Sequence, residues 1–472
     1  MKCLKALLIC SLGLLSSLRV GAGTVTAVPL PNPQVPGFSF PESEATVVGW
    51  VTAMDGGGPD AATATANVYL HAWGIWTALT MQTSEIDSNQ NLRVFETWYT
   101  PQELSTLPKP GTAAAMATML RRRASLVHFN QFQHGSAVQE QPMPFGTVGS
   151  DTVFGYVKFD PTAAAHIRSQ QLLKLATLNQ LIQGGAQQIP VFPPTALSLK
   201  SAFEVITAQT LVNGRYFRLN AWTGPPATPQ AWGPSSWPGV VWIDVLGGGS
   251  GNGQVDMVAS TDGSSRTEET TYPVSSMINH RLSQIEAMEF NVEQPGSGAA
   301  VGDYAVLVAM HVAGREIARW TWQTFWWTPT PGDPQFPSST TIAGERPAQL
   351  VGAARNYAMS LAYDMVTPGQ PNVGGTNTGN AIYAFNPYLE ARFGPSNLPD
   401  SEMGYSPGGQ SAANNVGVQC NCMSCHARAN YNPGNLSTAP KYSGARYTDL
   451  NDPQFSGTLQ VDLLWSLPEI AH

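Results

Sequence analysis

The chain has 472 residues, of which only 12% are charged, and its formal net charge is −8 at pH 7. The low content of Lys and Arg leaves no basic patch for nucleic acid, and beyond the N-terminus no apolar stretch is long enough to span a membrane. The 45 Gly, 37 Pro and 13 Trp agree with a globular protein that is rich in turns and buried aromatic residues.

The N-terminus has the pattern of a secretory signal peptide. Lys2 and Lys5 form a basic start, residues 6–18 form an apolar core, and residues 20–22 are Val-Gly-Ala, a small-residue cleavage site. We therefore expect residues 1–22 to be removed on export and the mature protein to be periplasmic or secreted.

Strand-like patterns dominate the first three quarters of the chain. Stretches rich in β-branched and aromatic residues alternate with clusters of Gly, Pro and Asn, which are typical of turns. The expected strands cover residues 45–53, 155–159, 197–207, 216–223, 240–246 and 305–327. Residues 240–246 are almost all apolar, which predicts a strand that is buried on both faces.

Helical periodicity occurs in fewer places. Leucine and isoleucine side chains between 172 and 182 share one helical face, and Gly184-Gly185 would end that helix. Residues 113–127 are rich in Ala and Met and also predict a helix. Pro347 is suited to the first turn of a third helix, which we expect to extend to about residue 361.

The most informative motif is Cys422-Met423-Ser424-Cys425-His426, a C-x-x-C-H sequence. Two thiols at this spacing can each form a thioether bond to a haem vinyl group, and the following histidine can ligate the iron from the proximal side. Export of the chain meets a second requirement of covalent haem c. The motif therefore predicts one covalently attached haem, bound through Cys422 and Cys425, with His426 as the proximal ligand.

Two other readings of the motif stay open. Cys420, Cys422, Cys425 and His426 supply four soft donors for zinc, although no second cysteine pair exists in the chain. The two motif cysteines could instead form a redox dithiol, but the flanking residues do not read as the βαβ setting of thioredoxin-like proteins. With haem attached, Cys420 would be a spectator thiol or would serve an intermolecular or redox role.

We expect an α+β fold that is mainly β. The Pro- and Gly-rich stretch 328–344 predicts a boundary near residue 345. Residues 23–345 would form a large β-rich body, and residues 346–472 a haem-binding segment of loops and helix that packs against it.

The sixth ligand of the iron decides which function is expected. A Met or His side chain in this position indicates an electron carrier, whereas an open position allows a small molecule to bind. Our candidate is His311, because it lies in the apolar, strand-like run 305–312, where a buried imidazole needs a partner. Met403, shortly before the motif, is the runner-up, and Met359 and Met365 are further candidates. The nearby aromatic residues 320–327 are interpreted as core packing, with a binding platform or an electron relay as the alternative.

Several segments resemble a group of large, uncharacterised, exported bacterial proteins of the single-haem cytochrome c family. The similar segments are residues 71–79, 95–98, 199–203, 310–312, 320–325 and 386–390, together with the haem motif. This chain departs from the group at Trp326-Trp327, where the similar proteins have Glu-His. The resemblance implies an exported haem protein but no particular reaction.

The expected function is therefore that of an exported mono-haem c-type cytochrome that transfers electrons to or from a redox partner protein. The alternative is a haem enzyme or a small-ligand sensor with an open distal iron site, which would bind a small molecule. The sequence shows no catalytic set of a hydrolase.

Overall fold

The computed structural model describes residues 25–106, 122–128, 153–376, 378–395, 397, 398, 416–434 and 444–471. Its centre is an antiparallel sheet in which the strands lie in the order β13-β12-β11-β5-β4-β3, with β10 also paired to β11. These strands are β3 (Val127–His128), β4 (Phe154–Phe159), β5 (Leu197–Ile206), β10 (Asn279–Arg281), β11 (Tyr304–Gly314), β12 (Thr321–Trp327) and β13 (Tyr357–Ala362).

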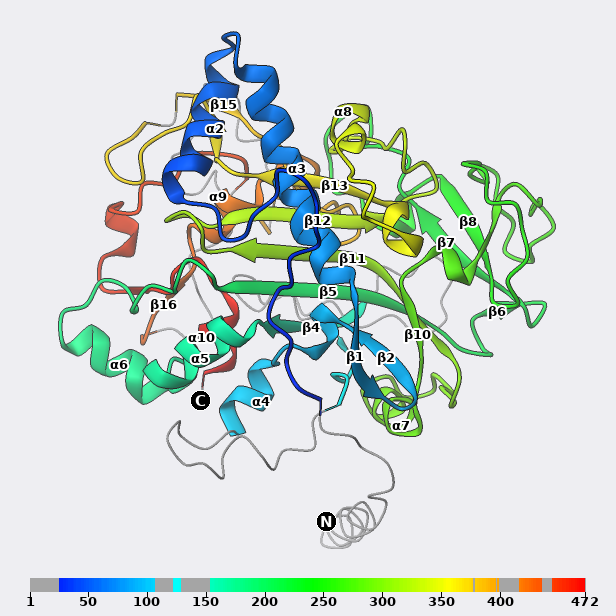
Figure 1. The fold of residues 1–472 in the computed structure, drawn as a ribbon. Helices are drawn as coiled ribbons and strands as arrows, with labels where there is room; N and C mark the ends of the chain where they lie inside the picture. Colours follow the sequence, from blue (N-terminus) through cyan, green and yellow to red (C-terminus); the bar gives the residue numbers. More distant parts are fainter. Residues whose placement is uncertain are drawn as a thin grey trace, which may run out of the picture.

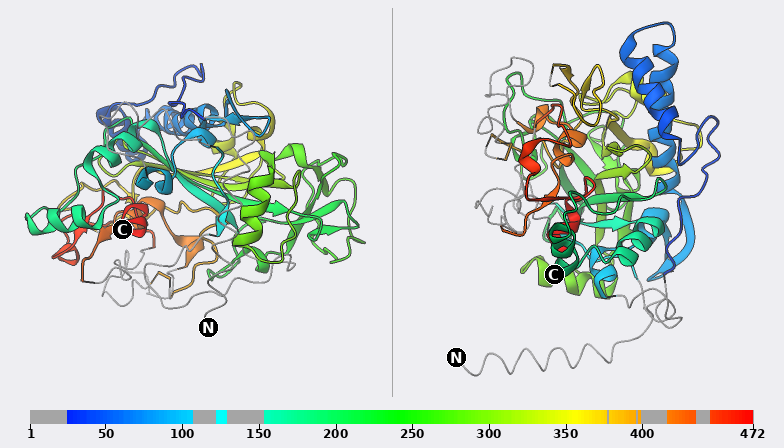
Figure 2. Two further views of the ribbon diagram at one scale, coloured as in Figure 1. Left: turned by 90° about the horizontal axis from the view of Figure 1, so that it is seen from below. Right: turned by 90° about the vertical axis from the view of Figure 1, so that its left-hand side faces the viewer.

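A pair of helices, α2 (Glu44–Gly56) and α3 (Ala61–Thr80), lies over one face of the sheet, and the C-terminal segment lies over the other (Figures 1 and 2). The long helix α3 packs its buried side directly on β12. The Trp76 ring stacks on Phe325 with centroids 4.3 Å apart. Because the two layers bury opposite faces, the strands of the central sheet are apolar on both sides.

A second sheet contains β6 (Leu211–Val212), β7 (Tyr216–Ala221), β8 (Gly239–Asp244) and β9 (Thr271–Pro273) in that order. Strand β8 is buried along its whole length, as its apolar sequence predicted. The smaller elements pair with one another or pack against the two sheets. They are the pairs β1 (Gln82–Asp87) with β2 (Gln90–Arg93), β14 (Val366–Thr367) with β15 (Asn380–Ala381), and β16 (Asn430–Tyr431) with β17 (Leu459–Gln460), and the helices α4 (Pro101–Thr106), α5 (Pro161–Gln170), α6 (Leu175–Gln183), α7 (Gln284–Glu293), α8 (Thr340–Gly344), α9 (Cys422–His426) and α10 (Ser466–Ile470), with 3₁₀ turns η1 (Val94–Thr97), η3 (Pro234–Ser236), η4 (Val274–Ser276), η5 (Gly352–Asn356), η9 (Gly417–Gln419) and η10 (Pro453–Phe455).

The α+β class is confirmed: 27% of the described residues are helical and 22% lie in strands. Four local predictions were wrong or incomplete. The expected strand 45–53 is part of α2, whose first turn is capped by the Ser43 side chain. The stretch 305–327 is two strands, β11 and β12, rather than one. The helix expected between 172 and 182 is the shorter α6, which ends before Gly184 as predicted.

The helix expected after Pro347 is a 3₁₀ turn, η5, followed by strand β13. Strand β13 pairs with β12 from Tyr357 to Ala362 and forms one edge of the central sheet. The segment 346–472 therefore contains strand β13 of the central sheet as well as the motif. A boundary near residue 345 would separate β13 from the other strands of this sheet. The helix expected at 113–127 lies mostly outside the described residues.

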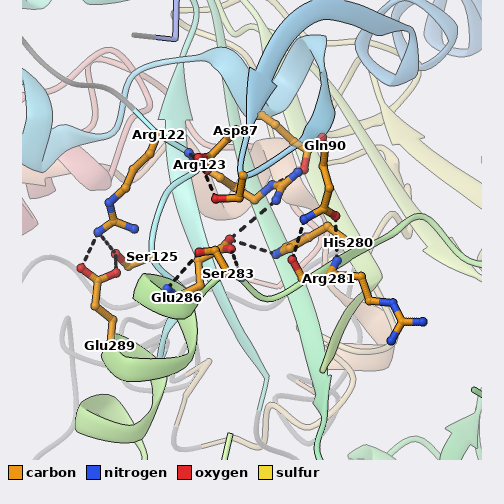
Figure 3. A network of polar contacts seen from close by, with 12 residues as sticks. Asp87, Gln90, Arg122, Arg123, Ser125, His280, Arg281, Ser283, Glu286 and Glu289 are labelled. Carbon is orange, nitrogen blue, oxygen red and sulfur yellow. Dashed lines mark hydrogen bonds and ion pairs between the residues drawn. The ribbon is translucent and has the colours of Figure 1, made fainter. Parts of the chain in front are cut away.

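A buried network of charged side chains joins residues 122–128 to η1 and α7 (Figure 3). The Arg123 guanidinium lies 2.8 Å from Glu96 Oε1 and 3.7 Å from Glu286 Oε1. His280 Nε2 lies 3.2 Å from the same Glu286 oxygen, although the contact is not aligned as a regular hydrogen bond. The Arg123 backbone N–H also donates to Asp87 at 2.8 Å. These contacts join the three segments through their charged side chains.

Candidate functional site

The motif forms the short helix α9, which packs against β12 and β13. Asn421 fixes the start of this helix. Its side-chain oxygen accepts the Ser424 N–H at 3.0 Å, and its side-chain amide donates to the carbonyl groups of Ile382 and Asp364. Because Asn421 is fully buried, these bonds fix the first turn of α9 relative to the loop that follows β13.

The spacing of the motif places its reactive groups on one side of α9. Cys422, Cys425 and His426 are partly exposed, whereas the intervening Met423 and Ser424 are buried. Positions i, i+3 and i+4 of a helix share a face, which explains this separation. The Ser424 hydroxyl donates to the carbonyl of Arg446 at 2.6 Å on the buried side. Two thiols and an imidazole therefore point to the same side, as covalent attachment of a haem requires.

The His426 ring is held by two contacts. Its Nδ1 lies 2.8 Å from the carbonyl oxygen of Leu463. This bond requires the hydrogen on Nδ1, so the ring nitrogen that carries the lone pair is Nε2, the atom that would ligate iron. The indole of Trp322 lies against the imidazole, with ring centroids 4.0 Å apart at 33°. The donor set and its tautomer fit a haem attached to this motif.

The environment of Cys420 and Cys422 favours the neutral thiol over the thiolate. Burial raises the pKa of both Cys420 and Cys422 well above the usual range, and the neighbouring Glu390 carboxylate adds to the effect. A reactive redox thiol needs a lowered pKa, so this environment disfavours the dithiol reading. In the described part of the chain, no group of three or more His, Cys, Asp or Glu side chains is arranged to hold a metal ion.

His311 lies on β11 and faces the same side of the sheet as Trp322. It pairs with Thr324, which is two residues beyond Trp322 on β12. Its Nε2 lies 2.7 Å from Glu390 Oε1, and both side chains are about one-sixth exposed (17% and 16%). Ligation of iron through this nitrogen would require the contact with Glu390 to break. The structure thus places His311 on the motif side of the sheet, with a carboxylate as its partner.

Glu390 is itself fixed in place. Its second oxygen accepts the Asn386 N–H at 2.7 Å, and the buried Asn386 side chain donates to the Thr324 hydroxyl and to the Phe325 carbonyl. The carboxylate is therefore tied to β12 as well as to His311. The chain six residues before Glu390 reaches the motif, because Ala384 donates its N–H to the Cys420 carbonyl at 3.0 Å and accepts the Cys422 N–H at 3.1 Å.

The methionine candidates for the sixth ligand differ from His311 in where their side chains point and in what they contact. Met359 pairs with Phe325 on the opposite face of the sheet, toward α3, so its side chain is directed away from the motif side. Met365 is buried, and its sulfur accepts the Thr448 N–H at 3.3 Å. Met403 lies outside the described residues, as do residues 1–22 with the expected signal peptide.

The aromatic residues after β11 are buried, as the packing interpretation predicted. Trp320, Trp322, Phe325, Trp326 and Trp327 are each less than 5% exposed. They do not form an exposed binding platform. Trp322 differs from the others because its ring contacts His426.

Two further histidine–carboxylate pairs are fully buried. His71 belongs to α3 and lies between the Tyr363 hydroxyl at 2.7 Å and Glu316 at 3.0 Å. His280 lies beside Glu286 in the charged network (Figure 3). The side chains of both pairs are at most 3% exposed. Both pairs are closed to solvent, whereas the His311–Glu390 pair is partly open to it.

Sequence reasoning identified the motif but missed its partners. The Leu463 carbonyl is a backbone group 37 residues after His426, and no side-chain pattern marks such an acceptor. Glu390 and Asn386 lie in the segment 386–390, which the family resemblance included but to which it assigned no role. The position of Asn421 directly before the helix was the one available signal, since Asn is a preferred N-cap.

Among the described residues, no helix is both long enough and apolar enough to cross a lipid bilayer. A comparison with models of known protein families found no match, and comparisons with curated proteins and with solved structures also found none.

Proposed function

We propose that this protein is an exported, mono-haem c-type cytochrome that transfers electrons, with one haem c attached through Cys422 and Cys425 and ligated by His426. The observation that carries the proposal is the arrangement on α9. The two thiols and the imidazole share the partly exposed side of the helix, and the Leu463 carbonyl selects the tautomer that can bind iron.

A bound haem would supply a one-electron iron centre. The chain itself orients the imidazole through Leu463 and Trp322. Strands β12 and β13 support the helix α9 that carries the motif. Export to the periplasm or the medium is part of the proposal and rests on the N-terminal sequence. The partner would be a second redox protein that approaches the partly exposed side of the motif.

The second candidate is a haem enzyme or small-ligand sensor with an open distal position. The contact of His311 with Glu390 favours it, because this histidine already has a carboxylate partner at 2.7 Å. A distal side with a polar, partly exposed pair would suit a small protic ligand. Under the main proposal His311 would give up this contact, or another residue such as Met403 would be the sixth ligand.

The attachment is tested with the double variant Cys422→Ser/Cys425→Ser, expressed in a host that matures c-type cytochromes. The wild-type chain should keep its haem stain on a denaturing gel, and the double variant should lose it. Cys420→Ser is the matched control, because this buried thiol lies outside the motif and its replacement should leave the stain. Haem that stays attached to the double variant would disprove the assignment.

The two candidate functions are separated by absorption spectra of the reduced protein with and without carbon monoxide. A low-spin spectrum that carbon monoxide does not change would support the electron carrier. Rapid binding of carbon monoxide would support the open site.

A further inference from the structure

The carbonyl that holds His426 lies in an unusual turn. Asp462 and Leu463 both have left-handed backbone conformations, with φ of 46° and 63°. For residues other than Gly this conformation costs about 1 kcal/mol or more per residue, so two in succession persist only where the surrounding structure holds them. The turn directs the Leu463 carbonyl to His426 Nδ1 at 2.8 Å.

Contacts of the Asp462 side chain hold this turn. Its Oδ2 accepts the Phe192 N–H at 2.9 Å and the Arg315 Nε–H at 3.1 Å. The two side chains of this ion pair are 5% and 13% exposed. Arg315 is fixed in turn, because its Nη1 donates to the Ile317 carbonyl at 2.8 Å and its backbone N–H donates to Ala196.

Strand β12 supplies the second contact to His426, through Trp322. The Trp322 indole N–H donates to the Arg319 carbonyl at 2.8 Å, and its ring lies on the imidazole. The segment 315–322 therefore supports the His426 ring twice, directly through Trp322 and indirectly through Arg315, Asp462 and the Leu463 carbonyl. Both supports begin on the rigid central sheet.

We propose that Arg315 and Asp462 are positioning residues for His426: they hold the strained turn so that the Leu463 carbonyl keeps its hydrogen bond to Nδ1. This inference rests on the proposed function, in which His426 ligates a haem iron. A hydrogen bond at Nδ1 makes the imidazole a stronger donor through Nε2 and favours the oxidised metal. Loss of Arg315 or of the Asp462 carboxylate should therefore raise the reduction potential of the site.

The test compares Arg315→Met and Asp462→Asn with the wild-type holoprotein. The control is Arg215→Met, which removes an arginine from an arginine–aspartate pair in the second sheet. The Asp244 carboxylate of that pair accepts hydrogen bonds from Arg215 and from the N–H groups of Leu246 and Gly248. Each protein is examined by haem stain, thermal unfolding, spectroelectrochemical titration and electron paramagnetic resonance of the oxidised form.

We expect covalent haem in all variants. In Arg315→Met and Asp462→Asn, the ratio of reduced to oxidised protein at a fixed potential should rise about three- to tenfold. A tenfold change corresponds to about 59 mV for a one-electron couple. The resonance lines should broaden as the imidazole samples several orientations. Arg315→Lys should give an intermediate result, because Lys restores the charge but not the Nε geometry.

An unchanged potential and unchanged resonance lines in Arg315→Met would overturn the inference, as would an equal shift in Arg215→Met. Arg315 lies at the edge of the core, so this variant keeps the test valid if Asp462→Asn does not fold. Absence of covalent haem in the wild-type chain would refute the proposed function instead, so the two failures are distinguishable.

Discussion

Replacement of Arg123 by Met tests the buried charged network in Figure 3. Arg123 is 1% exposed and lies between the carboxylates of Glu96 and Glu286. Met retains much of the volume and removes the charge. Glu96 would then stay buried without its main cationic partner, and Glu286 would keep His280 beside it. Loss of one partner is what makes a broken internal ion pair expensive.

The magnitude follows from the pKa of Glu286. Burial alone raises this pKa, but His280, Arg123 and the Ser283 N–H together lower it from 4.5 to about 2. Since one pKa unit is worth about 1.4 kcal/mol, the net lowering corresponds to about 3 kcal/mol, of which Arg123 supplies a smaller share than His280. Removal of one partner from a buried pair costs about 3–5 kcal/mol in other proteins. We therefore expect Arg123→Met to lose about 3 kcal/mol of unfolding free energy at pH 7.

The sign of the pH dependence follows from the same lowering. A carboxyl group whose pKa is lower in the folded state stabilises the fold above about pH 4.5, and this contribution disappears as the pH falls toward 2. The wild-type unfolding free energy should therefore decrease over this range. In Arg123→Met the pKa of Glu286 is higher, so the decrease below pH 4.5 should be smaller.

The assay is urea unfolding, followed by tryptophan fluorescence, at several pH values. Arg122→Met is the matched control, because the neighbouring Arg122 pairs with Glu289 through partly exposed side chains, and such pairs contribute less than about 1 kcal/mol. The reasoning fails if the two variants differ by less than about 1 kcal/mol at pH 7.

Two further predictions concern stability. Burial, with a smaller contribution from Asp55, raises the pKa of Asp364 from 3.8 to about 6. Ionisation of this carboxyl group therefore destabilises the fold as the pH rises through that range. Asp364→Asn should raise the unfolding free energy by about 1–2 kcal/mol at pH 7 and leave it unchanged at pH 4, as measured by urea unfolding at both pH values. Gly74 lies in α3, where a Cβ atom would approach the Phe38 ring to 2.1 Å, so Gly74→Ala should destabilise the protein by about 1–3 kcal/mol. In α2, a Cβ atom at Gly49 would meet nothing within 4 Å, so Gly49→Ala should stabilise the protein by about 0.5–1 kcal/mol. Equal melting temperatures for the two variants would contradict the steric argument.

Local sequence signals predicted those parts of the structure that depend on neighbouring residues. The apolar run of β8 and the turn signals around it predicted a strand buried on both faces. The C-x-x-C-H spacing predicted that its two thiols and the imidazole act together, and helical geometry alone places them on one side of α9. Each prediction depends on residues that are close together in the sequence, and tertiary packing did not override it.

The partners of the motif depend on contacts between distant segments, which such periods do not encode. The Val-rich stretch 45–53 became helical because Ser43 caps α2 and α3 packs beside it. Residues 357–362 became a strand because β12 offered an edge for pairing. His426 obtained its orientation from a backbone carbonyl and a tryptophan ring, supplied by residues 463 and 322. A carbonyl group is present at every residue, so only the folded chain shows which one reaches the imidazole.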